Sequence, residues 1–342
     1  MNLQTTYLGL PLRNPLVASA GPLSQTVDGV KGLVDGGVGA VVLYSLFEEQ
    51  VRAQLEQAER DAQLEEEHAD LFAEASSYFP SVSAEPVETV AAKYLTLVEK
   101  ASRAIDVPLI ASLNGSSLGS WVHFAKQLEE AGASALELNI YFVPGDTSLA
   151  GTDVEHRHLD IVAAVKQSIS IPVSVKLAPY FSSFGSFALQ LVEAGADGLV
   201  LFNRFLQPDV DVERVEVVPG VELSNPSESR LPRTWIAALR NRLPVSLAAT
   251  SGVETADDVA AYLLAGADVV MTTSALVRHG RDYSRVLLDG LGTWLARKGF
   301  RSLDAARGLL AVPADADVAG YQRAGYVTAL EKAKSRYGSL VG

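Results

Sequence analysis

The chain contains no cysteine. This absence excludes disulfides, thiolate metal sites, cysteine nucleophiles and any iron–sulfur cluster held by this chain. Long hydrophobic segments are also missing, because no apolar run approaches the roughly 20 residues that cross a bilayer. The first residues, MNLQTTYLGLPLRNPL, lack the basic start and the apolar core of a signal peptide. These absences predict a soluble cytoplasmic protein that does not enter a membrane.

Positive charge is scarce. Lysine and arginine number 28 against 41 aspartates and glutamates, which leaves a formal net charge of −13. DNA, RNA and anionic lipid are therefore disfavoured as partners. The histidines form no HExxH or comparable set, and His156 and His158 lie two positions apart, where helical residues do not share a face. We expect no metal site and a small molecule as the substrate.

One pattern is repeated along the chain: an amphipathic helix, a short Gly-Ala or proline-marked turn, and a continuous apolar strand. Continuous apolar strands that alternate with helices indicate a parallel sheet covered by helices. Eight such units predict an α/β protein with a closed (β/α)8 TIM barrel, and an open doubly wound sheet is the alternative. The segments that carry the eight strands are residues 14–20, 33–45, 107–113, 128–140, 171–178, 191–203, 243–250 and 263–273.

We expect a single domain over residues 1–342, with the barrel core at about residues 5–300. Residues 47–76 are strongly acidic with apolar positions at helical spacing, which predicts a helical insertion that is solvated or offers a partner surface. Residues 208–226 alternate apolar and polar around a Pro-Gly pair and predict a β-hairpin insertion. Residues 281–342 are predicted to form extra helices that pack outside the barrel.

Polar side chains follow the predicted strands at the points where the apolar runs end. In a (β/α)8 barrel, the C-terminal ends of the strands line the active site. In chain order these ends carry Ser19-Ala20-Gly21, Tyr44-Ser45, Asn114-Gly115, Asn139, Lys176, Asn203-Arg204, Thr250-Ser251-Gly252 and Thr273-Ser274.

Lys176 is the most informative of these residues, because it interrupts the apolar run VSVKLAP. An inward lysine at a strand mouth needs an anionic partner, or its pKa must fall. A ligand that develops negative charge would provide that partner. The alternative is a lysine whose stem packs on the barrel while its ammonium reaches the solvent at the rim.

The last two strand ends are suited to phosphate. TSGVET places Gly252 before a helix start, with Thr255 as a plausible N-cap and Asp258 three residues on. MTTSAL places Thr273 and Ser274 at the start of the next helix. Backbone N–H groups at such starts bind anions, and barrels commonly hold phosphate after strands 7 and 8. Ordinary helix capping is the alternative use of these residues.

Three asparagines at strand ends, Asn114, Asn139 and Asn203, supply hydrogen-bond donors and acceptors without charge. Such groups suit an uncharged heterocycle rich in N–H and C=O groups, such as an isoalloxazine. The structural alternatives are a turn residue at Asn114 and a bond to the barrel backbone at Asn139.

Taken in order, these strand ends resemble the class 1 dihydroorotate dehydrogenase family of FMN-dependent (β/α)8 barrels. The resemblance covers roughly residues 5–300. It is carried by the ordered motifs NPLVASAG, SLNG, LELNI, VKLAP, GLVLFN, SGVETADDV and AGADVVMTTSAL.

The resemblance implies FMN as the cofactor. Ala20 and Gly21 would lie beside the flavin ring, Asn139 and Asn203 would contact the ring or the substrate, and Lys176 would stabilise negative charge near flavin N1 and O2. Gly252, Thr273 and Ser274 would hold the phosphate. The full predicted cofactor-binding set is Ala20, Gly21, Ser45, Asn114, Asn139, Lys176, Asn203, Ser251, Gly252, Thr273 and Ser274.

The chain departs from the family at the expected catalytic base. The family motif N-x-S-C-P-N supplies a cysteine, or a serine in relatives, where this chain has Phe142. Tyr44 stands where the family usually carries a lysine, and the asparagine-bearing loop after strand 2 is not recognisable. Tyr141 and Tyr44 are secondary candidates for the base, beside Lys176 as the main catalytic residue. Tyr141 and Phe142 are otherwise expected to form an aromatic wall over the flavin or to pack under the acidic insertion.

The resemblance implies hydride transfer between a small CH–CH substrate and FMN, nominally dihydroorotate to orotate in pyrimidine biosynthesis. Loss of the base makes dihydroorotate a poor substrate, since general base catalysis contributes about 10²- to 10⁴-fold. A non-catalytic FMN-binding barrel that serves as a partner subunit is one alternative, and a flavin-free phosphate-binding lyase or isomerase is another. No NAD fingerprint identifies the electron acceptor, and a homodimer is expected by analogy with the family.

Overall fold

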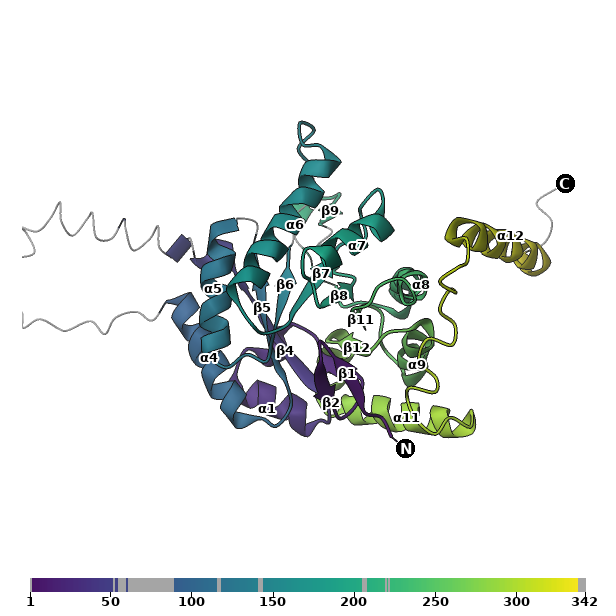
Figure 1. Cartoon of the computed structure of the whole chain (residues 1–342), viewed down its shortest axis with the longest axis horizontal. Helices are drawn as coiled ribbons and strands as arrows, with labels where there is room; N and C mark the ends of the chain where they lie inside the picture. The colour runs from purple at the N-terminus through teal and green to yellow at the C-terminus, as the bar shows by residue number, and fades with distance from the viewer. Residues whose placement is uncertain are drawn as a thin grey trace, which may run out of the picture.

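The computed structural model describes residues 2–51, 53–54, 60, 89–115, 118–140, 144–204, 208–218, 220 and 222–337. At its centre, eight parallel strands close into a barrel in the order β11-β12-β3-β4-β5-β6-β7-β8 (Figure 1). The (β/α)8 barrel predicted from the sequence is confirmed, and each predicted strand segment overlaps one barrel strand. The strands are β3 (Leu16–Ala18), β4 (Ala40–Phe47), β5 (Leu109–Asn114), β6 (Ala135–Asn139), β7 (Val173–Leu177), β8 (Gly198–Leu201), β11 (Ser246–Ala249) and β12 (Val269–Thr272).

Helices surround the barrel and bury their apolar faces against the strands. Local capping fixes where they begin and end. At α9, Thr255 accepts a hydrogen bond from the Asp258 amide, and the Asp258 carboxylate accepts from the Thr255 amide, which confirms the predicted capping box. The outer helices are α1 (Val27–Asp35), α4 (Val90–Ala104), α5 (Leu118–Glu130), α6 (Gly151–Ser168), α7 (Phe184–Glu193), α8 (Arg230–Leu239), α9 (Ala256–Ala265) and α11 (Tyr283–Arg297), with the short helices η1 (Pro22–Ser24), η2 (Pro226–Ser229) and α10 (Ser274–His279).

An N-terminal hairpin, β1 (Thr5–Tyr7) with β2 (Leu10–Leu12), packs against the interior of the barrel. Its turn residues Leu8 and Gly9 both have positive φ, 54° and 76°, as a two-residue turn of type I′ requires. Tyr7 and Leu8 join the apolar side chains inside the barrel, including Val42 and Met271. The sequence analysis did not predict this hairpin, because the segments TTY and LPL carry too little apolar–polar alternation and the turn Leu8-Gly9 is not one of the pairs that mark a hairpin.

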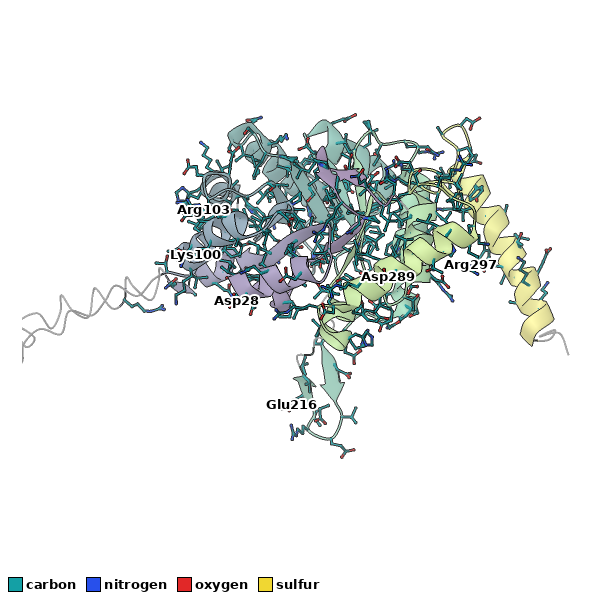
Figure 2. All side chains as sticks on the ribbon, turned by 90° about the horizontal axis from the view of Figure 1, so that it is seen from below. Asp28, Lys100, Arg103, Glu216, Asp289 and Arg297 are labelled. Atoms are coloured by element: carbon teal, nitrogen blue, oxygen red, sulfur yellow. The ribbon has the colours of Figure 1, made fainter. Side chains whose placement is uncertain are left out.

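The predicted hairpin insertion is present as β9 (Asp209–Asp211) paired antiparallel with β10 (Glu216–Val218). Figure 2 shows this hairpin, which carries Glu216, projecting from the body of the barrel. The predicted insertion ran to residue 226, but residues 226–229 belong to η2. The predicted helical insertion at 47–76 lies mostly outside the described residues.

The two long C-terminal helices differ in how they pack against the barrel. Helix α11 packs against α9 on the outside of the barrel, as predicted. Helix α12 (Val318–Tyr337) instead extends away from the barrel, and its described side chains are mostly exposed (Figure 1). Among the described residues, no helix combines the length and the apolar character needed to cross a membrane.

Candidate functional site

The polar strand ends predicted from the sequence lie together because all eight barrel strands are parallel. Parallel strands place their C-terminal ends at one end of the barrel. Every member of the predicted cofactor-binding set is among the described residues. The candidate bases are divided: Tyr44 is described, whereas Tyr141, like Phe142, lies outside the described residues.

Lys176 lies inside the mouth of the barrel and is only 8% exposed. Its Nζ lies 3.4 Å from Ser19 Oγ and 3.4 Å from Glu137 Oε1. Ser19 follows β3, on the opposite side of the barrel from β7, so the lysine extends across the interior. The alternative of a lysine that reaches solvent at the rim therefore does not hold.

Glu137 is a site residue that the sequence analysis did not single out. It lies in β6, is fully buried, and forms the ion pair with Lys176. A carboxylate inside the apolar run ALELNI is the same signal that identified Lys176 in VSVKLA, so the sequence contained the information needed to find it.

Two of the strand-end asparagines form a pair. Asn203 Nδ2 donates to Asn139 Oδ1 at 2.8 Å. The Asn139 amide can still donate and the Asn203 carbonyl can still accept, since each side-chain amide carries both functions. Asn114 is buried and lies beside Asn139, its partner across the parallel strands β5 and β6. The mouth of the barrel thus offers uncharged donors and acceptors next to one lysine.

The ends of β11 and β12 are adjacent, because these strands pair with each other. Ser251 and Gly252 both have positive φ, 79° and 69°, so the backbone turns sharply after β11. The Tyr262 hydroxyl supports this turn by donating to the carbonyl of Ser251 at 2.7 Å. At the end of β12, Thr273 Oγ1 donates to the Ser19 carbonyl at 2.7 Å.

Ser224 is a second residue that the sequence analysis missed. It is buried, and both its backbone amide and its hydroxyl lie 3.0 Å from Ser274 Oγ. Ser224, which lies 50 positions before Ser274 in the chain, thereby contacts the predicted phosphate loop. No signal in the sequence points to Ser224, because the loop that carries it has no period.

The backbone at these loops is packed too closely for larger residues. A Cβ atom on Gly21 would lie 2.5 Å from Thr273 Cγ2, and one on Gly252 would lie 2.7 Å from the Asn225 carbonyl oxygen and from the Ser229 nitrogen. Close backbone approach around exposed polar groups is how glycine-rich loops hold phosphate. This cradle, together with the buried lysine and the amides, fits the FMN expected from the sequence.

Tyr44 and Ser45, at the end of β4, both contact neighbouring side chains. Ser45 Oγ lies 2.8 Å from Ser112 Oγ, within hydrogen-bonding distance of another buried hydroxyl. The Tyr44 ring packs edge-on against Tyr94, and burial raises the pKa of Tyr44 above its ordinary value. A higher pKa leaves less phenolate at neutral pH, so Tyr44 is a poorer base than the sequence suggested.

The described residues contain no group of three or more histidine, aspartate or glutamate side chains that could hold a metal ion. His156 is exposed on α6, whereas His158 is buried, with its Nδ1 2.7 Å from the Val154 carbonyl and its ring against Phe181 and Phe187. Burial lowers the pKa of His158, and the charge of Arg157 acts in the same direction.

His158 should therefore make stability depend on pH. The unfolded chain takes up a proton on this residue below about pH 6.5, the ordinary pKa of histidine, while the folded protein resists it. The unfolded state then binds more protons, so the free energy of unfolding should fall as the pH drops below about 6.5. Urea unfolding at several pH values measures this slope. His158→Gln should flatten it, whereas the same change at exposed His123 should not.

Comparison with known proteins identifies the family to which this chain is similar. Residues 79–295 match the family model described as dihydroorotate dehydrogenase. Relatives named "Dihydroorotate dehydrogenase B (NAD(+)), catalytic subunit" include one from Methanothermobacter thermautotrophicus, which is 26% identical over 90% of this chain and 98% of its own length. Another, from Thermoplasma acidophilum, is 25% identical over 88% and 96% of the two chains. The Escherichia coli protein "NAD-dependent dihydropyrimidine dehydrogenase subunit PreA" is 26% identical over 90% of this chain and 76% of its own.

Proposed function

The chain belongs to the dihydroorotate dehydrogenase family, and on that premise we propose that it is an FMN-dependent oxidoreductase. Its substrate is a small organic molecule that exchanges hydride with the flavin at a CH–CH group. The relatives named as dihydroorotate and dihydropyrimidine dehydrogenases support this reaction class.

One observation carries the proposal: a buried lysine crosses the mouth of a barrel whose last two strands end in a tight, glycine-containing cradle. Burying a lysine costs several kcal/mol unless the charge is used or compensated. A phosphate-tailed ring that gains negative charge when it is reduced would use the lysine and the cradle together.

Bound FMN supplies the ring that accepts hydride. Within this chain, Lys176 would provide positive charge to the reduced flavin, which would favour reduction. Asn139 and Asn203 orient the ring or the substrate through the amide groups that their mutual bond leaves open. Ser251, Gly252, Thr273 and Ser274 hold the phosphate. Ala20, Gly21, Ser45 and Asn114 complete the proposed FMN-binding set.

We propose that dihydroorotate is at best a slow substrate. Phe142 cannot accept a proton, and Tyr44 has a raised pKa, so neither replaces the family's base. Tyr141 remains a candidate base from sequence alone. The preferred substrate would then be one whose oxidation needs less assistance from a base, within the dihydropyrimidine-like class that the relatives' names suggest.

The experiment is an absorbance spectrum followed by anaerobic mixing. Purified protein should be yellow, with a flavin band near 450 nm that is released as FMN on denaturation. Dihydroorotate should bleach that band about 10²- to 10⁴-fold more slowly than it bleaches a relative that carries the cysteine base. A colourless protein that does not take up added FMN would overturn the assignment, and rapid bleaching would overturn only the substrate argument.

A non-catalytic FMN-binding barrel that acts as a partner subunit is the second candidate. The word "subunit" in the relatives' names favours a partner chain, whereas "catalytic subunit" in one of those names favours catalysis by the barrel itself. Flavin that no substrate of the class reduces, together with stable co-purification of a second protein, would support this candidate. Sedimentation of the purified chain tests the homodimer expected from the family.

A further inference from the structure

Glu137 has an unusual environment for a carboxylate. It is 0% exposed, on a strand in the barrel interior, and two positions before Asn139. Residues two apart on a strand point to the same side, so Glu137 and Asn139 face the same interior. Glu137 pairs in register with Ser174, and Asn139 with Lys176, which places the carboxylate one layer below the lysine.

The two oxygens of Glu137 are not equivalent. Oε1 lies 3.4 Å from Lys176 Nζ, and this is the one ion pair that either residue forms among the described residues. Oε2 is buried and has no hydrogen-bond partner in the described part of the chain. Two buried tyrosines respond to the charge of this carboxylate: the pKa of Tyr7 is raised by burial first and by Glu137 second, and the pKa of Tyr94 is raised by burial first, with a smaller contribution from Glu137.

An ion pair in this arrangement is expected to contribute little to the stability of the fold. A buried ion pair often adds less to stability than apolar side chains of similar size, and an unpartnered carboxylate oxygen adds a further desolvation cost. The residues in register with Glu137 on the two flanking strands are the buried serines Ser112 and Ser174, and no hydrogen bond from either to Oε2 is found in the described part of the chain. Something other than stability therefore accounts for a charge at this position.

We infer that Glu137 is a positioning residue: it holds Lys176 across the mouth of the barrel and offsets part of the charge that the lysine presents to FMN. This inference rests on the proposed function. In the chain without FMN, Glu137 is the counter-charge that makes a buried ammonium tolerable. With FMN bound, it limits how strongly the lysine favours the reduced state.

The sign of the effect follows from the charges. Reduction adds negative charge beside Lys176, which the lysine stabilises and the carboxylate beneath it opposes. Removing the carboxylate charge leaves the lysine unopposed. Glu137→Gln should therefore favour reduced flavin, by about tenfold in the ratio of reduced to oxidised flavin at a fixed potential, or about 30 mV for a two-electron couple.

The measurement is the flavin reduction potential, obtained by anaerobic equilibration with a reference dye. Asp268→Asn is the matched control, because Asp268 is also a buried carboxylate in ion pairs, with Arg240 and Arg307. It precedes β12 at the opposite end of the barrel from the strand ends that carry the site. The control should lower stability without moving the potential.

A second measurement needs no flavin. Urea unfolding of the FMN-free protein with Glu137→Gln, Lys176→Met and both changes forms a double-mutant cycle. Each single change should destabilise the fold by leaving a buried charge unpaired, and the double variant should be more stable than the sum of the single effects predicts.

The outcomes separate the inference from the proposed function. Wild-type protein that binds FMN while Glu137→Gln leaves the potential unchanged would overturn the inference alone. Additive unfolding energies in the cycle would also overturn it, because Glu137 would then not be holding Lys176. If the wild-type chain binds no FMN, the proposed function fails and the inference fails with it.

Discussion

Replacing Lys176 by methionine should slow substrate-driven reduction of the flavin by about 100- to 1,000-fold. That is the typical cost of removing one preorganised group that stabilises charge developing in a transition state. The lysine is buried and aimed across the interior, so bulk solvent screens its charge only weakly. Stopped-flow absorbance near 450 nm under anaerobic conditions measures the rate constant.

Lys176→Met also leaves Glu137 buried without its partner, which should lower the free energy of unfolding by about 3–5 kcal/mol. The double change with Glu137→Gln should recover much of that stability while reduction stays slow. Lys166→Met is the control: Lys166 pairs with Asp197 at 2.5 Å on the outside of the barrel, so its loss should not change flavin reduction. Normal reduction rates in the double variant would remove Lys176 from the mechanism.

Replacing Gly252 by alanine should weaken FMN binding by about 30- to 100-fold. The residue has φ of 69°, and a Cβ atom there would lie 2.7 Å from two backbone atoms of the neighbouring loop. Relief of this crowding requires the loop to move. A bound phosphate must restore the original position, at a cost of about 2–3 kcal/mol, the upper part of the usual range for such strain.

Gly280→Ala is the matched control for this change. Gly280 also has positive φ, 89°, but open space surrounds the position of its Cβ, at the far end of α10 from Ser274. It should share the loss of stability that comes from the backbone conformation and leave FMN affinity unchanged. Fluorescence titration of the FMN-free proteins measures affinity, and equal losses in both variants would show that Gly252 has no special relation to the phosphate.

The barrel could be predicted because each of its eight strands is a continuous apolar run between helices, and this signal lies within ten or so neighbouring residues. The N-terminal hairpin could not be predicted, since TTY and LPL show too little apolar–polar alternation and Leu8-Gly9 is not a typical hairpin turn pair. The sequence also did not predict that α12 extends away from the barrel. Helix-forming residues predict a helix but do not determine what it packs against.

The residues of the site likewise fall into those that a local sequence pattern predicts and those that it does not. Lys176, Asn139 and Gly252 were found because each interrupts or ends a local pattern. Glu137 had the same signal as Lys176 and was overlooked, whereas Ser224 had none. The raised pKa of Tyr44 depends on burial near Tyr94, a residue fifty positions away in the chain, and only the fold brings the two rings together.

The sequence by itself determined the barrel, its family, and which residues stand at the strand ends, because alternation of apolar and polar residues and chain order are local properties. Only the tertiary structure decided that Lys176 reaches across to Ser19 and rests on Glu137, and that Ser224 meets Ser274. Those pairs join residues that are 39 to 157 positions apart. Closure of the barrel brings them within bonding distance, and no local pattern encodes that closure.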